Sequence, residues 1–158
     1  MIFITLGSQK FQFDRLLKAV DELVSDGKIE DEVFAQTGYS GYKPAHFEYK
    51  DFLDREDFGK KMDESDIVIA HGGTGAIIGA VKKGKKVIAV PRLSKYGEHV
   101  DDHQVQIIEQ FRDLDLICAC PDTEDLEASL RFVKNNEFKS YESNTQSIVE
   151  SIESFLAL

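Results

Sequence analysis

Apolar residues gather in short blocks along the chain, and each block is separated from the next by a polar or glycine-rich stretch. Blocks of this kind, with no alternation of apolar and polar positions, predict strands that are buried on both faces of a sheet. Such strands are expected at residues 1–6, 32–37, 66–70, 87–90 and 116–119, with a more polar extended segment at 46–52.

Between these blocks the apolar positions recur every three or four residues, which is the spacing of a helix with one buried face. The clearest case is the first, where Phe13, Leu16, Leu17, Val20 and Leu23 would line one face. Further helices are expected at residues 54–65, 76–83, 101–111 and 123–133. Strands that alternate with helices predict an α/β fold, a Rossmann-like, doubly wound parallel sheet of about six strands.

The end of the chain carries one more apolar stripe after a polar stretch at residues 135–144. The stripe predicts an amphipathic helix over residues 145–158, formed by Ile148, Ile152, Phe155 and Leu156. This helix either packs back on its own sheet or docks on a second chain. The total of 158 residues, 42% of them hydrophobic, suits a single domain over residues 1–158.

The charge balance argues against a polyanionic partner. Lys and Arg number 19 against 29 Asp and Glu, which gives a net charge of −10, so nucleic acid is not an expected partner. No apolar stretch approaches the ~20 residues that span a bilayer, and no leader pattern follows Met1, so a cytoplasmic location is expected. Cys118 and Cys120 lie two apart in an apolar run and are interpreted as reduced, packed thiols.

Candidate binding residues follow the predicted strands directly. In a doubly wound sheet, ligands bind beyond the carboxyl ends of the strands, near the point where the strand order reverses. Glycine is frequent there because it adopts positive φ at low cost. The candidates in these loops are Gly7 and Ser8 after the first strand, Thr37 and Gly38 after the second, and Arg92 after the fifth.

The loop after the fourth strand is the strongest candidate, because it runs directly into a helix. In the sequence AHGGTG, backbone N–H groups of Gly72 and Gly73, together with the Thr74 hydroxyl and the helix dipole, would favour a diphosphate. The sequence lacks the Gly-Lys-Ser/Thr of a nucleoside triphosphatase loop and the spaced glycines of a dinucleotide dehydrogenase. A tight turn without a ligand remains the alternative.

A second group of polar residues lies between Arg92 and Gln104. A metal site would need His99 and His103 on one helix, and Gly97 argues against that, so no metal is expected. Asp101 or Asp102 could cap the following helix. His103 and Gln104 would then lie in its first turn, where their side chains could reach sugar hydroxyls. The chain has no G-x-S-x-G sequence, which disfavours acyl-transfer hydrolysis.

These residues carry a family resemblance. Residues 64–104 resemble the carboxy-terminal, donor-binding half of the GT-B glycosyltransferases of family 28, and FITLGSQKF at residues 3–11 resembles the start of the small subunit of the eukaryotic two-part UDP-GlcNAc transferase. The segment GEHVDDHQ at residues 97–104 is most similar to the small catalytic subunit of the β-1,4-galactosyltransferase pair of Gram-positive capsule and exopolysaccharide synthesis. The resemblance covers residues 1–132.

The resemblance implies a single GT-B half that binds a UDP-sugar, with no tightly bound cofactor and with Mg²⁺ at most accompanying the nucleotide. It implies that the diphosphate lies over Gly72, Gly73 and Thr74, and that the uracil lies near Phe52. Asp102 and Arg92 would belong to the same site. Many members carry a Glu on the helix after the glycine turn, where it binds the ribose, but this chain has Gly79 there. Ribose recognition must then come from elsewhere, or nucleotide affinity is reduced.

A GT-B enzyme needs two such halves, so the resemblance implies a membrane-anchored partner subunit that binds a lipid-linked saccharide and recruits this chain to the inner face of the membrane. The reaction would be an inverting hexose transfer, with galactose favoured and GlcNAc second. Candidates for the catalytic base are His71, His99 and His103, or a group of the partner. The alternative is a non-catalytic subunit that binds UDP-sugar or acts as a scaffold.

Overall fold

The computed structural model, which describes residues 1–142 and 150, contains a six-stranded sheet in the order β3-β2-β1-β4-β5-β6. All five strand pairings are parallel, and the order reverses between β1 and β4. The strands are β1 (Ile2–Thr5), β2 (Val33–Gln36), β3 (Glu48–Lys50), β4 (Ile67–His71), β5 (Lys86–Val90) and β6 (Cys118–Ala119). This is the doubly wound parallel sheet that the apolar blocks predict.

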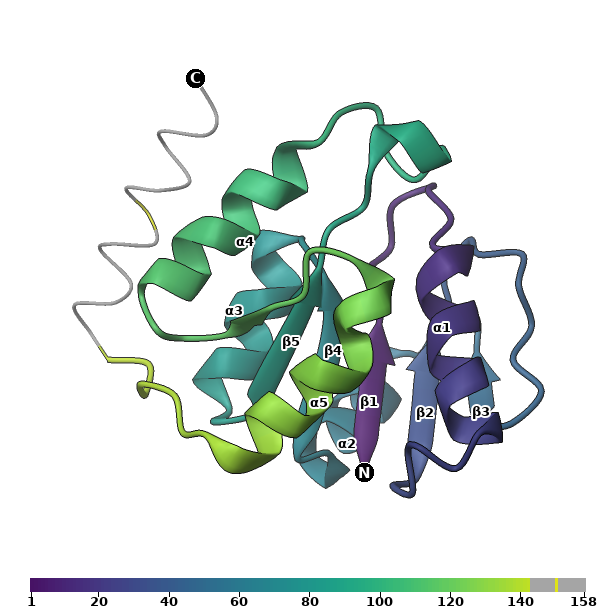
Figure 1. Cartoon of the computed structure of the whole chain (residues 1–158), viewed down its shortest axis with the longest axis horizontal. Coiled ribbons are helices and arrows are strands. Elements are labelled where there is room, and N and C mark those ends of the chain that lie inside the picture. The colour runs from purple at the N-terminus through teal and green to yellow at the C-terminus, as the bar shows by residue number, and fades with distance from the viewer. Residues whose placement is uncertain (143–149, 151–158) are drawn as a thin grey trace.

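Helices cover both faces of the sheet (Figure 1). One face packs against α1 and α5, and the other against α2, α3 and α4. The α-helices are α1 (Asp14–Ser25), α2 (Arg55–Glu64), α3 (Thr74–Lys82), α4 (His103–Asp113) and α5 (Leu126–Asn135), with 3-10 turns η1 (Ser94–Tyr96) and η2 (Thr123–Asp125). Some expected bounds differ in detail: α3 begins two residues earlier than predicted, α4 runs over 103–113 rather than 101–111, and the helix at 123–133 divides into η2 and α5.

The central strands contribute to a core on each side of the sheet. In β1, Ile2 and Ile4 pack toward α1 and α5, whereas Phe3 packs toward the opposite helices. Successive side chains of a strand point to opposite faces, so a strand with both faces buried must be apolar at every position. Cys118 and Cys120 are free and buried in the same core, as their spacing predicts.

The two outer strands are the shortest, with three residues in β3 and two in β6. β3 also exposes Glu48 and Lys50 on either side of its half-buried tyrosine. The helix expected over residues 145–158 lies outside the described residues. Among the helices that the structure does describe, none has the length and apolar character needed to cross a membrane.

Candidate functional site

The loops after β1 and β2 meet at the carboxyl edge of the sheet, the upper edge in Figure 1. Gly7 and Gly38 have φ angles of +74° and +60°, and a Cβ on Gly38 would lie 3.1 Å from the Gly7 carbonyl oxygen. Thr37 is buried behind them, and its hydroxyl donates to Asp51 Oδ1 at 3.2 Å. Ser8 is exposed at the surface of the first loop. Glycine is therefore required here both for the backbone conformation and for the close approach of the two loops.

An exposed aromatic pair lies beside this contact. The rings of Phe52 and Tyr39 meet edge to face with centroids 5.2 Å apart, although 42% and 51% of the two residues are exposed. A Cβ on Gly38 would lie 4.0 Å from the Phe52 ring. Sequence reasoning named Phe52 as a binding residue but gave no role to Tyr39, which lies in the candidate loop after the second strand. Together the two rings form an apolar rim next to the glycine contact.

The glycine turn differs from its predicted arrangement at Gly72. Its N–H donates to Gln104 Oε1 at 2.9 Å, and a Cβ there would lie 2.6 Å from the Gln104 Cβ. Gly72 is thus packed against α4, and its N–H is not free to bind a phosphate. The available backbone donors begin at Gly73, the N-cap of α3, and at Thr74, its first residue, since no side chain caps this helix. The diphosphate site expected from the sequence therefore loses Gly72 and keeps Gly73 and Thr74.

Behind the turn, three side chains form a buried group that we call the His71 cluster: His71, Arg92 and Gln104. Arg92 is 1% exposed, and its Nη2 donates to the carbonyl oxygens of Leu6 at 2.7 Å and Phe11 at 3.2 Å. Gln104 Oε1 accepts a second bond from the Arg92 backbone N–H at 2.9 Å. Arg92 and Gln104 therefore hold the loops together from behind, rather than lying at the cleft surface as the sequence predicts.

The cluster determines the protonation state of His71. Its Nδ1 lies 3.2 Å from Arg92 Nη1 and 3.4 Å from Gln104 Nε2. Both neighbours are donors, because guanidinium has no acceptor and Gln104 is oriented by the two N–H groups on its oxygen. Burial first, and then the charges of Arg92 and His99, lower the pKa of His71 to about 3. The neutral ring therefore has its lone pair on Nδ1 and its proton on Nε2.

The His71 ring lies between two glycines. A Cβ on Gly7 would lie 2.6 Å from Nε2, and a Cβ on Gly73 would lie 2.2 Å from Cε1. No described residue forms a hydrogen bond with Nε2. The Nε2–H is thus placed where the absence of two side chains leaves the backbone of the turn open. A proton already fixed on this nitrogen suits a hydrogen-bond donor rather than a catalytic base.

The other two candidates for the catalytic base, His99 and His103, flank the start of α4. His99 lies before the helix, where Gly97 has a φ of +69°, so the two histidines do not share a helix. Its Nδ1 is 3.2 Å from Asp101 Oδ1, and its ring packs 4.8 Å from that of Phe11. His103 is exposed and is the first residue of the helix.

The two aspartates that precede α4 have separate roles. Asp101 accepts the His103 backbone N–H at 2.9 Å, and this bond is the largest cause of the lowered pKa of Asp101. Asp102 instead accepts the N–H of Ser94 at 2.8 Å and its hydroxyl at 3.1 Å. Asp102 is the N-cap residue, but its side chain closes the loop instead of capping α4, whereas Asp101 accepts the N–H of the first helical residue, so both carboxylates have a structural use.

Sequence reasoning missed a buried ion pair that fixes this loop to α1. Glu98 is 1% exposed, and its two carboxylate oxygens accept from Arg15 Nε and Nη2, both at 3.0 Å. Glu98 Oε1 also accepts the Leu93 N–H at 3.0 Å. The partners are 83 positions apart, and no local pattern in the sequence links them.

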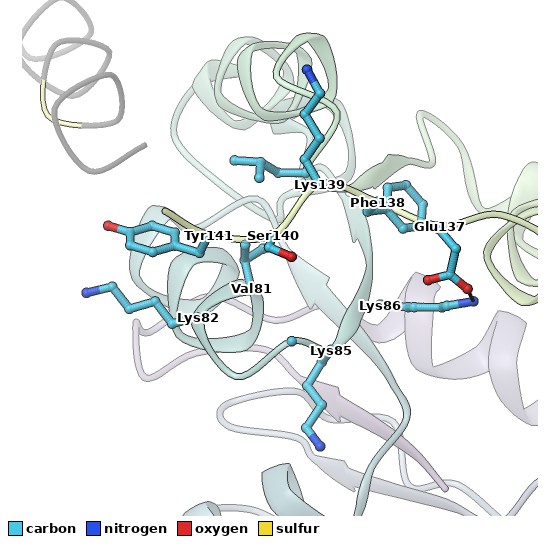
Figure 2. Close-up of a pocket in the computed structure, with 11 residues that line it drawn as sticks. Val81, Lys82, Lys85, Lys86, Glu137, Phe138, Lys139, Ser140 and Tyr141 are labelled. Carbon is cyan, nitrogen blue, oxygen red and sulfur yellow. Dashed lines mark ion pairs between the residues drawn. The ribbon is translucent and has the colours of Figure 1, made fainter. Parts of the chain in front are cut away.

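A cavity of about 250 Å³ lies at the opposite edge of the sheet, where β5 begins, and contains none of the predicted site residues. Figure 2 shows that the ammonium groups of Lys82, Lys85 and Lys139 around it point away from one another. They do not converge on a common point, so this cavity does not compete with the carboxyl edge as the functional site.

The chain resembles known proteins in sequence. A family model described as the glycosyltransferase family 28 C-terminal domain matches residues 1–157. Over 91 residues the chain is 35% identical to the UDP-N-acetylglucosamine transferase subunit ALG13 of Saccharomyces cerevisiae, a match that covers 54% of this chain and 43% of that protein. The protein of the same name from Debaryomyces hansenii is 34% identical over 89 residues, with 54% and 41% covered. The match thus spans less than half the length of these relatives.

Solved structures share the fold. An NMR structure of ALG13 superimposes with a TM-score of 0.61 and 21% identity, covering 92% of this chain and 91% of that one. The crystal structure of MurG from Acinetobacter baumannii gives 0.53 and 21%, with 96% and 49% covered. The glycotransferase of kitacinnamycin gives 0.58 and 12%, with 99% and 39% covered. The sheet therefore has the Rossmann-like fold that the sequence predicts, and these three solved structures share it.

Proposed function

Because the chain belongs to the glycosyltransferase family 28 C-terminal domain family, we propose that it is the UDP-sugar-binding, catalytic half of a two-component glycosyltransferase. The observation that supports this most is the buried cation beside the glycine turn. Arg92 contacts two carbonyl oxygens and an imidazole, and within residues 1–142 no carboxylate forms an ion pair with it. In a chain of net charge −10, this leaves positive charge next to the N-terminus of α3, which favours an anionic ligand.

The UDP-sugar donor is held at two places along the carboxyl edge of the sheet. The diphosphate lies at Gly73 and Thr74, where backbone donors remain, and the uracil lies on the rim formed by Phe52 and Tyr39. A Cβ at Gly79 would have no atom within 4 Å, so close packing does not explain glycine at this position. The helix has no carboxylate there for the ribose, so its hydroxyls are bound from another element or from the partner.

The proposed reaction is a direct displacement at the anomeric carbon. The acceptor oxygen forms a bond to C1 as the bond from C1 to the UDP oxygen breaks, and a base takes the proton of the acceptor hydroxyl. His99, whose Nδ1 faces Asp101, and His103 are the candidates from this chain, and the partner is the other source of the base. The dipole of α3 and the positive charge of the His71 cluster stabilise the departing UDP.

The identities that we propose for the partner subunit and the transferred sugar are based on the family resemblance and on the names of the relatives. We propose a membrane-anchored subunit that binds a lipid-linked saccharide and recruits this chain to the cytoplasmic face of the membrane. The names of the relatives specify N-acetylglucosamine and a subunit, and no comparison supports galactose or a capsule role. UDP-GlcNAc is therefore the first donor to test, with UDP-galactose second.

The first test is calorimetric titration of the purified chain with UDP, with ADP as the control for base selectivity. The second uses membranes from a strain that lacks the chain, incubated with radiolabelled UDP-GlcNAc or UDP-galactose. Adding the chain should restore sugar transfer to extractable lipid. No binding of UDP, or equal transfer without the chain, would refute the proposal.

The second candidate is a subunit that binds UDP-sugar or acts as a scaffold without catalysing transfer, and the missing carboxylate at Gly79 favours it. The same membranes separate the two. A double variant, His99→Gln with His103→Gln, should bind UDP but fail to restore transfer if this chain supplies the base. Full transfer by the double variant would assign the base to the partner.

A further inference from the structure

The His71 ring lies between the loop after β1 and the glycine turn. Its Nε2 would lie 2.6 Å from a Cβ on Gly7 and 2.8 Å from a Cβ on Gly73. The ring is 7% exposed, so its orientation is fixed by neighbours rather than by solvent. The nitrogen that faces the turn is therefore determined by the contacts on the opposite side of the ring.

Those contacts are made by Arg92 and Gln104. The nearer is Arg92 Nη1 at 3.2 Å from Nδ1, and the amide of Gln104 is 3.4 Å away. Arg92 cannot rotate freely, because its Nη2 donates to the carbonyl oxygens of Leu6 and Phe11, and its guanidinium lies 5.4 Å from the Phe13 ring. A guanidinium only donates hydrogen bonds, so a fixed Arg92 keeps Nδ1 unprotonated.

From this geometry we propose that Arg92 is a positioning residue, which acts through His71 by holding it as the Nε2–H tautomer so that the imidazole donates a hydrogen bond to a phosphate at the glycine turn. Arg92 does not contact the phosphate itself, because its side chain is 99% enclosed behind the ring. Its charge also polarises the ring, and a hydrogen bond with a charged partner is stronger than one between neutral groups. This inference rests on the proposed binding of a nucleoside diphosphate.

The direct test is the ring ¹⁵N spectrum of His71 in the unmodified protein. We expect an unprotonated Nδ1 and a protonated Nε2 between pH 5 and pH 8, with no titration in that range. Addition of UDP should shift the Nε2 resonance more than the Nδ1 resonance. A protonated Nδ1, or UDP binding that leaves Nε2 unchanged, would overturn the inference while the proposed function stands. Failure of UDP to bind would overturn both.

Variants of Arg92 separate positioning from a structural role. Arg92→Met removes the donor, so both tautomers of His71 should appear, and the affinity for UDP should fall on the order of tenfold or more. Arg92→Lys keeps a charged donor and should restore the Nε2–H tautomer and most of the affinity. Arg112→Met is the matched control, because Arg112 is a half-exposed arginine at the far end of α4.

The final control asks whether the loss of affinity in Arg92→Met depends on the phosphates of the ligand. Uridine has no phosphate, so its affinity, followed by chemical shifts, should be the same in Arg92→Met and in the unmodified protein. Equal losses for uridine and UDP would show that Arg92 only supports the fold, and would overturn the inference. Circular dichroism of each variant verifies that it is folded.

Discussion

A methyl group at Gly73 tests whether the His71 ring belongs to the nucleotide site. Gly73 is the N-cap of α3 with φ −81° and ψ 130°, a conformation that alanine adopts without strain. The Cβ of Gly73→Ala would, however, lie 2.2 Å from His71 Cε1, well inside van der Waals contact. The substitution therefore acts on the imidazole rather than on the backbone.

Relief of this overlap requires the ring to move by about 1 Å away from Gly73. Such a shift breaks the 3.2 Å contact with Arg92 and moves Nε2 away from the turn. Overpacking of this kind costs about 1–3 kcal/mol of folding stability. Loss of a hydrogen bond to a charged phosphate costs about 1.5–3 kcal/mol of binding, which corresponds to a loss of UDP affinity of about tenfold to hundredfold.

Gly75→Ala is the matched control, since a Cβ there has no atom within 4 Å. Gly75 lies two residues after Gly73, inside α3, and its replacement by alanine should increase the stability by up to about 1 kcal/mol, because alanine favours the helix. UDP affinity is measured by calorimetry and stability by thermal melting for both variants. A folded Gly73→Ala protein with unchanged UDP affinity would refute the assignment of His71 to the site.

Three further predictions concern the groups that support the site. Gln104→Ala leaves two buried N–H groups without an acceptor and should lower the free energy of unfolding by about 2–4 kcal/mol in urea, whereas exposed Gln106→Ala should change it by less than about 0.5 kcal/mol. Glu98→Gln removes the charge that Arg15 faces and should lower the free energy of unfolding by about 3 kcal/mol, with exposed Glu109→Gln as its control; equal urea midpoints for the two variants would contradict this. The pKa of His71 is lowered to about 3, so the unfolded chain takes up a proton below pH 6.5 that the folded protein does not, and stability should fall by about 2 kcal/mol from pH 7 to pH 5. His71→Gln should remove most of this fall, and an identical pH dependence in the variant would show that other groups cause it.

The sequence predicts the sheet well because its strands are buried on both faces. The run from Ile67 to Ala70 is apolar at every position and is bounded by polar residues, so its type follows from local pattern alone, although β4 continues one residue further, to His71. The same holds for the glycine turn, because a strand that ends in adjacent glycines and then becomes helical has few alternatives. Both the buried strand and the glycine turn are determined by residues that are adjacent in the sequence, so they can be predicted from it.

The arrangement behind the turn could not be predicted in this way. Gln104 and Gly72 are 32 positions apart, and their contact depends on which face α4 turns toward the sheet. The sequence shows that Gln104 is polar and near a helix start, which favours a surface role; its burial follows from the two backbone donors that it satisfies. The Arg15–Glu98 pair likewise depends on the approach of α1 to the loop after β5.

The short outer strands limit how this protein can join a second chain. Unpaired backbone groups on a long edge strand invite another strand to extend the sheet, a common route to aggregation and to swapped dimers. Here β3 offers only three residues, of which Glu48 and Lys50 are charged, and β6 offers only two. Backbone pairing along an edge is thus a poor basis for assembly, and a partner that binds the described part of the chain must recognise it through side chains. Specificity for that partner is then open to change by surface substitutions that leave the sheet intact.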